Sequence, residues 1–254
     1  MIEAVGLIPS RYGSTRLPGK ALALIHGVPL VQHVYERAKQ AKLLDDVIIA
    51  TDDERITAAA AKFGGKAVMT SAAHQSGTDR LAEVARKLDA QVIVNIQGDE
   101  PLMRPEQIDQ VVEFALAHGA VPVTTLRTAL TRQEDVTDPN VVKVVVDRDG
   151  YALYFSRAPI PYHRQVSGSS RSEVPDTGQP AYWKHLGIYG YQRHFLLQFP
   201  HLAPTPLERA EQLEQLRALE HGHKIQVLDT PYDTVGVDTP DDLKRVEQIL
   251  TGVR

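Results

Sequence analysis

The sequence predicts an α/β protein with a mostly parallel, Rossmann-like sheet and an antiparallel lobe. In the first 120 residues, short β-branched runs alternate with amphipathic helical segments, and this alternation is typical of a parallel sheet with helices on both faces. After about residue 120, apolar runs follow one another without helices between them, which favours antiparallel pairing. We therefore expect a single domain, 1–254, in which residues from about 120 to 192 form the lobe.

The parallel part should contain four strands and four helices. Residues 30–41 carry apolar side chains along one helical stripe, and Pro105 stands where the first turn of a helix tolerates proline. The expected strands are 4–8, 46–51, 66–70 and 91–97, and the expected helices are 30–41, 54–63, 78–88 and 105–117.

The remaining chain mixes strands, a polar loop and two returning helices. The turn "DRDG" at 147–150 lies between two β runs and predicts a hairpin. Residues 163–180 are rich in Ser, Gly and Pro, so we expect a mobile loop that could act as a lid. The expected strands are 121–128, 141–156, 185–192, 224–230 and 234–237, and the expected helices are 206–222 and 239–250.

Bulk composition excludes several classes of protein. The net charge is −4, which argues against a nucleic-acid partner held by bulk electrostatics. Cysteine is absent, so disulfides and thiolate metal sites are excluded. No apolar run approaches the roughly 20 residues that span a bilayer, and the amino terminus does not resemble a signal peptide. We expect a cytoplasmic protein without a membrane partner.

The loop "PSRYGSTRLPGK" at 9–20 follows an apolar strand and has the composition of a phosphate cradle. Gly13 and Gly19 match neither the Walker A spacing nor the dinucleotide fingerprint. Arg11, Arg16 and Lys20 can nonetheless oppose the charges of a polyphosphate, and ligands bind after strands of α/β sheets. A basic surface turn is the alternative.

Two acidic segments also follow apolar runs. Asp99 in "VNIQGDEP" is a plausible magnesium ligand, although Asp99 and Glu100 could instead cap the helix near Pro105. Asp238 in "VGVDTPDDL" could share a metal with Asp99, or it could belong to the cap of the last helix. In that helix Thr239, Pro240 and Asp242 fit the N-cap, N1 and N3 positions. For "TDDERI" at 51–56 we prefer a cap, formed by Asp52 or Asp53.

Several motifs together resemble one known family over essentially the whole chain. In order they are "IPSRYGSTRLPGK", "HQSGTDRLAEV", "VNIQGDEP", "NVVKVV", "GYALYFSRAPIP", "KHLGIYGY", "PLERAEQLEQLR" and "GVDTPDDL". Their combination resembles the 3-deoxy-manno-octulosonate (Kdo) cytidylyltransferases. The resemblance implies the nucleotide-diphospho-sugar transferase fold and a homodimer formed through the lobe.

The resemblance also implies a reaction. CTP and Kdo give CMP-Kdo and pyrophosphate with Mg²⁺, by in-line attack of the sugar hydroxyl on the α-phosphorus, in lipopolysaccharide biosynthesis. Such transfer needs positioning and charge neutralisation more than a covalent nucleophile. The implied catalytic residues are Lys20, Asp99 and Asp238, with both aspartates as metal ligands. The implied nucleotide-binding residues are Ser10, Arg11, Arg16, Lys20, Ser76 and Gly77.

A further group is expected to bind the acid sugar. Arg157 suits its carboxylate through bidentate pairing, and Glu211 and Gln215, four residues apart, would share one helix face. His185 could instead be a core histidine, Glu214 a solvated helix position, and the Ser76–Gly77 stretch a helix cap. The implied sugar-binding residues are Gln97, Arg157, His185, Glu211, Glu214 and Gln215.

Other functions remain open at this point. A related acid sugar, such as 8-amino-Kdo or a sialic acid, would use the same fold with a few different contacts. Another nucleotide or a non-catalytic nucleotide-binding module is a more distant alternative. A pure binder has no need of two metal carboxylates, so Asp99 and Asp238 favour the enzyme.

Overall fold

We describe a computed structural model of the chain, which covers residues 2–13, 17–164 and 182–252. The chain forms two compact units. Unit 1 contains residues 1–124, 187–201 and 234–254, and unit 2 contains residues 125–186 and 202–233. Each unit is thus built from segments that are distant in the sequence.

Unit 1 contains a sheet that is mostly parallel. Strand β1 lies between β6 and β4, and β4 pairs with β5, all in parallel. Residues 189–192 of β10 pair antiparallel with β6. The strands are β1 (Ile2–Ser10), β4 (Asp46–Thr51), β5 (Ala67–Met69), β6 (Ala90–Asn95) and β10 (Trp183–Gln192), the last with its first residues in unit 2. Parallel pairing places the carboxyl ends of β1, β4 and β6 at one edge, where ligands of α/β sheets bind.

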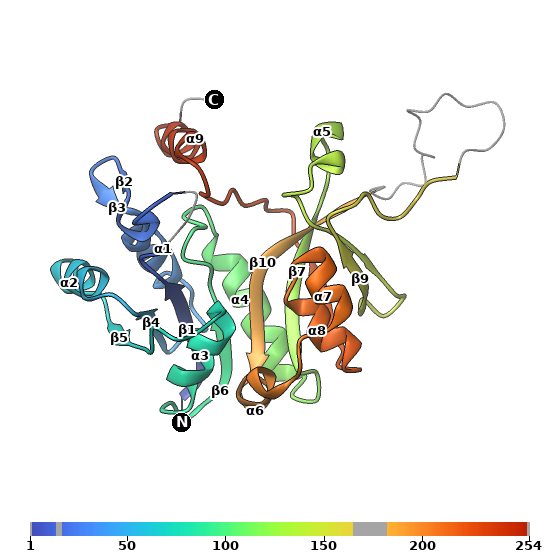
Figure 1. Cartoon of the computed structure of the whole chain (residues 1–254), viewed down its shortest axis with the longest axis horizontal. Helices are drawn as coiled ribbons and strands as arrows, with labels where there is room; N and C mark the ends of the chain where they lie inside the picture. Colours follow the sequence, from blue (N-terminus) through green and yellow to red (C-terminus); the bar gives the residue numbers. More distant parts are fainter. Residues whose placement is uncertain (1, 14–16, 165–181, 253–254) are drawn as a thin grey trace. The chain divides into compact units, whose positions relative to one another are not determined.

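Helices pack against this sheet (Figure 1). Helix α1 contacts β1 and β4, α3 contacts β1, and α4 contacts β6, while α1 also packs on α4 and α3 on α6. The helical elements of unit 1 are α1 (Leu30–Ala38), α2 (Glu54–Lys62), α3 (Gly77–Ala85), α4 (Pro105–Ala117), α6 (Arg193–Gln198), α9 (Pro240–Leu250), and the 3-10 helices η1 (Lys20–Leu22) and η2 (Phe199–His201). A short hairpin, β2 (Leu24–Ile25) with β3 (Val28–Pro29), completes the unit.

Unit 2 is built mainly on antiparallel pairing. Strand β8 pairs with both β10 and β9 in this sense. Its strands are β7 (Val123–Ala129, beginning in unit 1), β8 (Lys143–Val146), β9 (Ala152–Ser156) and β11 (Ile225–Asp229). Its helices are α5 (Gln133–Thr137), α7 (Pro206–Glu211) and α8 (Gln215–Glu220).

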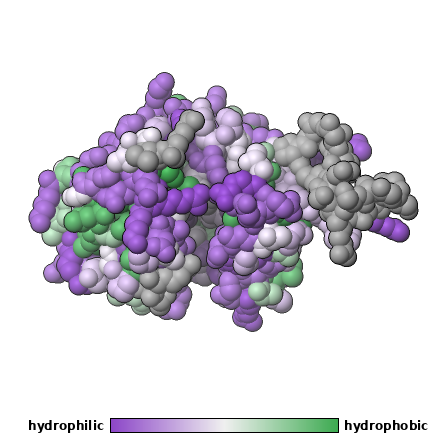
Figure 2. Space-filling view, turned by 90° about the horizontal axis from the view of Figure 1, so that it is seen from above, coloured by the Kyte–Doolittle hydropathy of each residue, from purple (hydrophilic) through white to green (hydrophobic). Residues whose placement is uncertain are grey.

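A small hydrophobic cluster fixes the carboxyl-terminal helix inside unit 1. Ile25, Leu30, Val237 and Val246 are fully buried together, so α9 is held against the β2–β3 hairpin and the start of α1. The face seen in Figure 2 is mostly hydrophilic. Among the described residues, no helix has the length and apolar character needed to cross a membrane.

The expected α/β class with a mostly parallel sheet is confirmed, and the helix expected at 105–117 is α4 itself. Three details were wrong or missed. The helix expected at 206–222 is two helices, residues 234–237 form no strand, and α5, α6 and the β2–β3 hairpin were not expected. Most of the loop expected at 163–180 lies outside the described residues.

Candidate active site

Beyond the carboxyl ends of β1 and β6, the fold of unit 1 brings one lysine and two aspartates together. Lys20 Nζ lies 2.6 Å from Asp99 Oδ2 and 3.0 Å from Asp238 Oδ1. The two aspartates stand 79 and 218 positions from the lysine in the sequence, so tertiary structure alone joins them. We call these three residues the Lys20 centre.

The backbone before Lys20 is shaped by a glycine and a tyrosine. Gly19 has a φ of 68°, in the left-handed region that glycine adopts without strain. A Cβ added to Gly19 would lie 3.2 Å from the Tyr12 hydroxyl. The Tyr12 ring lies under the Arg55 guanidinium, 3.3 Å from its centroid, and Arg55 forms an ion pair with Asp53. Tyr12 thus links the opening loop to the start of α2, and its carbonyl accepts from Gly19 N–H at 3.3 Å.

Asp238 stands between a buried anchor and a capped helix. Val237 is fully buried, and its N–H donates to the Asp99 carbonyl at 2.8 Å. Thr239 accepts from Asp242 N–H, and the Asp242 carboxylate accepts from Thr239 N–H, so a capping box begins α9. The cap expected at Thr239 is therefore confirmed, and the same cap holds the backbone next to Asp238.

The charges of the Lys20 centre depend on one another. Burial lowers the pKa of Lys20, but Asp99 and Asp238 outweigh burial and hold this pKa above its ordinary value. The exposed fraction of the side chain is 18% for Lys20, 30% for Asp99 and 42% for Asp238. One ammonium group faces two carboxylates, so the centre carries a net charge of −1 and can accept a cation.

Two carboxylates that converge on one ammonium group also fit a hard divalent cation, which prefers oxygen ligands. Among the described residues there is no cluster of three or more His, Cys, Asp or Glu that could hold a metal. A cation at Asp99 and Asp238 would therefore complete its shell with phosphate oxygens and water, as Mg²⁺ commonly does.

The predicted nucleotide-binding residues near β1 are only partly described. Ser10 is buried, and its Oγ has no hydrogen-bond partner among the described residues. A Cβ added to Gly98 would lie 2.9 Å from this Oγ and 2.8 Å from the Pro9 carbonyl, so only glycine fits there. Arg11 is exposed, and Arg16 lies outside the described residues.

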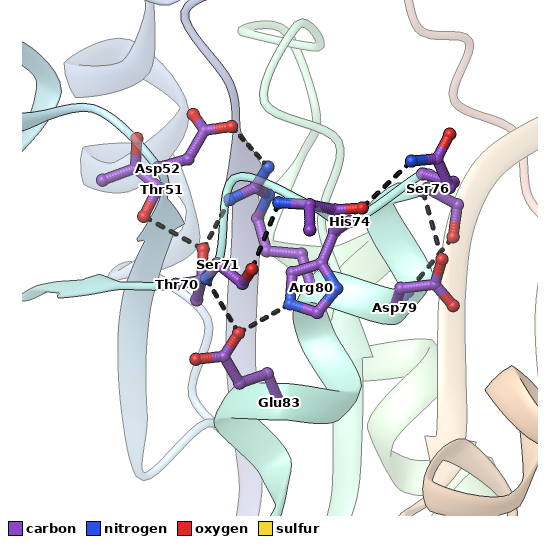
Figure 3. Close-up of polar contacts among 11 residues, drawn as sticks. Thr51, Asp52, Thr70, Ser71, His74, Ser76, Asp79, Arg80 and Glu83 are labelled. Atoms are coloured by element: carbon purple, nitrogen blue, oxygen red, sulfur yellow. Dashed lines mark hydrogen bonds and ion pairs between the residues drawn. The ribbon is translucent and has the colours of Figure 1, made fainter.

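Ser76 and Gly77 begin α3 (Figure 3). Ser76 Oγ accepts from Asp79 N–H at 3.1 Å, and the Asp79 carboxylate accepts from Ser76 N–H at 3.2 Å. The alternative that this stretch caps a helix is therefore confirmed. Capping does not conflict with a role in nucleotide binding, which remains a prediction.

Helix α3 also holds the segment that precedes it (Figure 3). Arg80 is almost fully buried and donates to Thr70 Oγ1 and, at 2.8 Å, to Asp52 Oδ2. Glu83 Oε2 accepts from Ser71 N–H at 2.9 Å and lies 2.6 Å from His74 Nε2. The pKa of Glu83 lies below its ordinary value. The hydrogen bond from Ser71 N–H lowers it most, the bond with His74 lowers it further, and burial only partly opposes them. The segment from 70 to 76 is thus fixed at several points.

In unit 2, Arg157 and Glu211 form a second centre. Glu211 accepts from Ser156 Oγ at 2.6 Å and from Arg157 N–H at 2.9 Å. The Arg157 guanidinium donates to the carbonyls of Glu211, Pro139 and Gln212 at 2.7, 2.9 and 3.3 Å. We call Ser156, Arg157 and Glu211 the Arg157 centre.

Glu211 is charged at neutral pH. Burial raises its pKa, but the hydrogen bonds from Ser156, from the Arg157 N–H and from Tyr154 outweigh burial and hold the pKa below its ordinary value. Tyr154 donates from 3.4 Å. The carboxylate is therefore anchored to β9 and the residue that follows it.

Glu211 and Gln215 do not share one helix face, contrary to expectation. Helix α7 ends at Glu211, Gln212 adopts the left-handed conformation with a φ of 52°, and α8 begins at Gln215. The Arg157 guanidinium binds the carbonyls at this break. It therefore satisfies backbone acceptors that end α7.

The other predicted sugar-binding residues lie in different surroundings. His185 is buried, its Nε2 lies 3.0 Å from Thr125 Oγ1, and burial lowers its pKa to about 3. It is therefore a neutral, hydrogen-bonded histidine. Gln215 is buried and Glu214 is partly buried before α8. Gln97 follows β6 in unit 1, where its side chain lies beside Gly187.

Among the residues that the structure describes, the sequence analysis missed two buried cations. Arg80 falls among apolar positions of α3, and Lys143 interrupts the run "VVKVVV". A charge inside an apolar stretch is the signal that would have found both, because charged side chains are almost never fully buried unless paired.

Known proteins match the chain over nearly its whole length. The family model described as Cytidylyltransferase matches residues 5–225. A 3-deoxy-manno-octulosonate cytidylyltransferase of Geobacter metallireducens is 52% identical over 250 residues, covering 98% of each chain. That of Geobacter sulfurreducens is 51% identical, covering 98% of this chain and all of the relative.

Solved structures agree with this match. A structure described as CMP:2-keto-3-deoxy-manno-octonic acid synthetase complexed with CTP superposes with a TM-score of 0.88 and 44% identity, over 98% of this chain and 99% of that one. A glucose-1-phosphate thymidylyltransferase described as putative, from Bacillus anthracis, gives a TM-score of 0.66 at 16% identity, over 99% and 96% of the two chains. This second likeness concerns the fold alone.

Proposed function

The chain belongs to the cytidylyltransferase family, and from this premise we propose that its Lys20 centre binds the triphosphate of CTP and its Arg157 centre the carboxylate of Kdo. The protein is a nucleotidyltransferase that activates Kdo with CTP, giving CMP-Kdo and pyrophosphate for lipopolysaccharide biosynthesis. The enzyme class requires charge neutralisation around a triphosphate, and the residues are assigned accordingly.

The observation that carries the assignment is the convergence of Asp99 and Asp238 on Lys20 Nζ. Enzymes of this family use a divalent metal ion, and we assign Mg²⁺ to the two aspartates. When bound, such an ion neutralises phosphate charge and lowers the pKa of a coordinated hydroxyl. Both carboxylates are partly exposed, so they can exchange the ammonium group for a cation.

Lys20 then serves the phosphates. An ammonium group carries its charge at neutral pH, so Lys20 can stabilise the negative charge that develops at the α-phosphate. Arg11 and Arg16 are assigned to the outer phosphates, and the Ser10 hydroxyl to the nucleotide. Ser76 and Gly77 are assigned to the cytosine, because the contacts of α3 fix this segment before any ligand arrives.

On the sugar side, Arg157 is assigned to the carboxylate, and Gln97, His185, Glu211, Glu214 and Gln215 to the hydroxyls. His185 is neutral, so one ring nitrogen can donate and the other accept. The 2-hydroxyl oxygen of Kdo forms a bond to the α-phosphorus as the bond to the β-phosphate oxygen breaks. Pyrophosphate carries away the electron pair, and the proton of the hydroxyl is released to solvent.

We also propose a cytoplasmic homodimer formed through the lobe. Leu153 on β9 is 61% exposed, and β9 pairs with β8 alone among the strands that the structure describes. An exposed apolar residue on an edge strand suits pairing with a second copy. A monomeric mass in solution would contradict the dimer.

The decisive experiment is pyrophosphate release with Mg²⁺, testing four nucleoside triphosphates against Kdo, 8-amino-Kdo and N-acetylneuraminate. We expect release with CTP and Kdo only, and none after chelation of the metal. Release with CTP and another acid sugar would change the assigned substrate and leave the proposed mechanism unchanged. No release with any pair would overturn the proposed activity.

A further inference from the structure

Unit 2 contains a lysine that is completely withdrawn from solvent. Lys143, the first residue of β8, is 0% exposed. Its Nζ donates to three backbone carbonyls, those of Asp138 at 2.9 Å, Val141 at 2.5 Å and Arg157 at 2.6 Å. The mechanism proposed above does not use this residue.

Burying an ammonium group is costly unless its hydrogen bonds are satisfied. Burial lowers the pKa of Lys143, and the charges of Asp138 and Glu211 only partly oppose this effect. An apolar residue would fill the same place in "VVKVVV" without that cost. Lys143 thus contributes hydrogen bonds to three carbonyls, and these carbonyls belong to two separate segments of backbone.

Both segments bear on Arg157: one contains its carbonyl, and the other contacts its side chain. The Arg157 carbonyl accepts from Lys143, and the Arg157 N–H donates to Glu211 Oε2 at 2.9 Å, so charged side chains hold this residue on both sides. The turn from 138 to 141 is held by Lys143 as well, and it presents the Pro139 carbonyl to the Arg157 guanidinium at 2.9 Å. Lys143 therefore fixes the Arg157 backbone and one of the groups that orient its side chain.

We propose that Lys143 is a positioning residue for the carboxylate site of the acid sugar, acting through Arg157. This inference rests on the function proposed above. Lys143 is fully buried and does not touch the substrate. Among the described residues, three of the five guanidinium N–H groups of Arg157 donate to carbonyls, and we assign the other two to the carboxylate of a 2-keto sugar acid. A misplacement of about 1 Å at such a group can cost on the order of 100-fold in rate.

The test compares two variants with a matched control. Lys143→Met removes the ammonium group and keeps an unbranched side chain of similar size. Lys143→Gln is neutral but retains two N–H donors for the carbonyls. Lys224→Met, at an exposed lysine of the same unit, is the control. Kinetics are measured with Kdo varied at saturating CTP, and with CTP varied at saturating Kdo.

We expect kcat/KM for Kdo to fall by about 10- to 100-fold in Lys143→Met, with the KM for CTP unchanged. Lys143→Gln should recover part of the loss, and the control should match the wild type. The methyl ester of Kdo supplies a second readout. It lacks the carboxylate charge, so Lys143→Met should lower activity on the ester much less than on the free acid.

Several outcomes separate failure of this inference from failure of the proposed function. A wild type that releases no pyrophosphate overturns the function itself. An active wild type in which Lys143→Met changes both KM values equally, or loses as much on the ester as on the acid, overturns the positioning role. If Lys143→Met does not fold, the acid-to-ester comparison is made with Lys143→Gln, and an unchanged ratio there overturns the inference.

Discussion

The Lys20 centre and the Arg157 centre use charged side chains in opposite ways. In the Lys20 centre, one ammonium group and two carboxylates bind each other, and all three keep some contact with solvent. In the Arg157 centre, Arg157 binds backbone carbonyls, while Glu211 binds a backbone N–H and a serine hydroxyl. Side chains that bind each other can change partners when a ligand arrives, whereas side chains that hold backbone define the shape of the chain.

This difference separates catalysis from stability. Partly exposed ion pairs contribute little to folding, typically about 0 to 1 kcal/mol. Buried polar groups that lose their partners cost on the order of 1 to 3 kcal/mol each. Substitutions in the Lys20 centre should therefore reduce turnover and leave folding almost unchanged. Substitutions around the Arg157 centre should affect folding as well.

The largest effect is expected for Asp238→Ala. Asp238→Ala removes one of the two proposed cation ligands of the Lys20 centre, and loss of one charge-stabilising group commonly lowers kcat by about 100- to 1,000-fold. CTP binding and the midpoint of thermal unfolding should change little, because Asp238 is partly exposed. The checks are pyrophosphate release, calorimetric titration with CTP, and circular dichroism.

Asp241→Ala, at an aspartate three positions further along the chain, in α9, whose side chain is 91% exposed, is the matched control. Turnover within threefold of the wild type in Asp238→Ala would remove this residue from the catalytic machinery. A large fall in the unfolding midpoint would show that the Lys20 centre is structural, and the contrast between the two centres would disappear.

A comparison of two lysines tests the contrast directly. Lys143→Met should lower the free energy of unfolding by about 3 kcal/mol or more, because three carbonyls lose a fully buried donor. Lys20→Met should lower it by about 1 kcal/mol or less, because its partners can be solvated. Urea denaturation of both variants measures the difference. Equal losses of unfolding free energy in the two variants would show that the exposure of Lys20 and Lys143 does not determine their contribution to stability.

The smallest effect concerns pH and His185. Its folded-state pKa of about 3 lies below the ordinary value of 6.5, so the unfolded chain binds a proton that the folded chain refuses. This histidine therefore costs stability as pH falls from 6.5 toward 3, by about 2 kcal/mol at pH 5. Urea denaturation at pH 7 and pH 5 measures how far the free energy of unfolding falls between them. This fall should be smaller by about 2 kcal/mol in His185→Gln than in the wild type.

His194→Gln, at an exposed histidine, should keep the pH dependence of the wild type. A His185→Gln protein with the same pH dependence as the wild type would mean that His185 accepts a proton while folded. A buried imidazole that stays neutral in the folded protein would then be excluded.

Local rules predicted those parts of the molecule whose cause is local. The cap of α9, the start of α4 at a proline and the cap at Asp53 follow from residue types at fixed spacing. The alternation of strands and helices predicted the sheet for the same reason. Asp99 and Asp238 were proposed to share a metal because both were expected to follow strands that end at one edge of a sheet. Residues 234–237 form no strand, and the bond from Val237 N–H to the Asp99 carbonyl places Asp238 there instead.

What the sequence analysis missed depends on contacts between distant segments. The helical pattern continues through Gln212, yet the chain breaks there where Arg157, more than 50 residues earlier, binds the carbonyls. The carbonyls around Lys143 come from a turn and from the residue after β9. No spacing rule within one segment reveals such pairs, although a lysine inside a run of valines marks the position.

The order of residues in the Lys20 centre has a consequence for synthesis on the ribosome. Lys20 and Asp238 are 218 residues apart, and the segment from 234 belongs to the unit that begins at the amino terminus. Unit 1 cannot be completed until the segment from 234 has left the ribosome. Contacts of such long range are slow to form, and a nascent chain that stops before residue 238 lacks one of the two carboxylates. Catalytic competence thus arises only after residue 238 has been synthesised, and shorter nascent chains should transfer nothing.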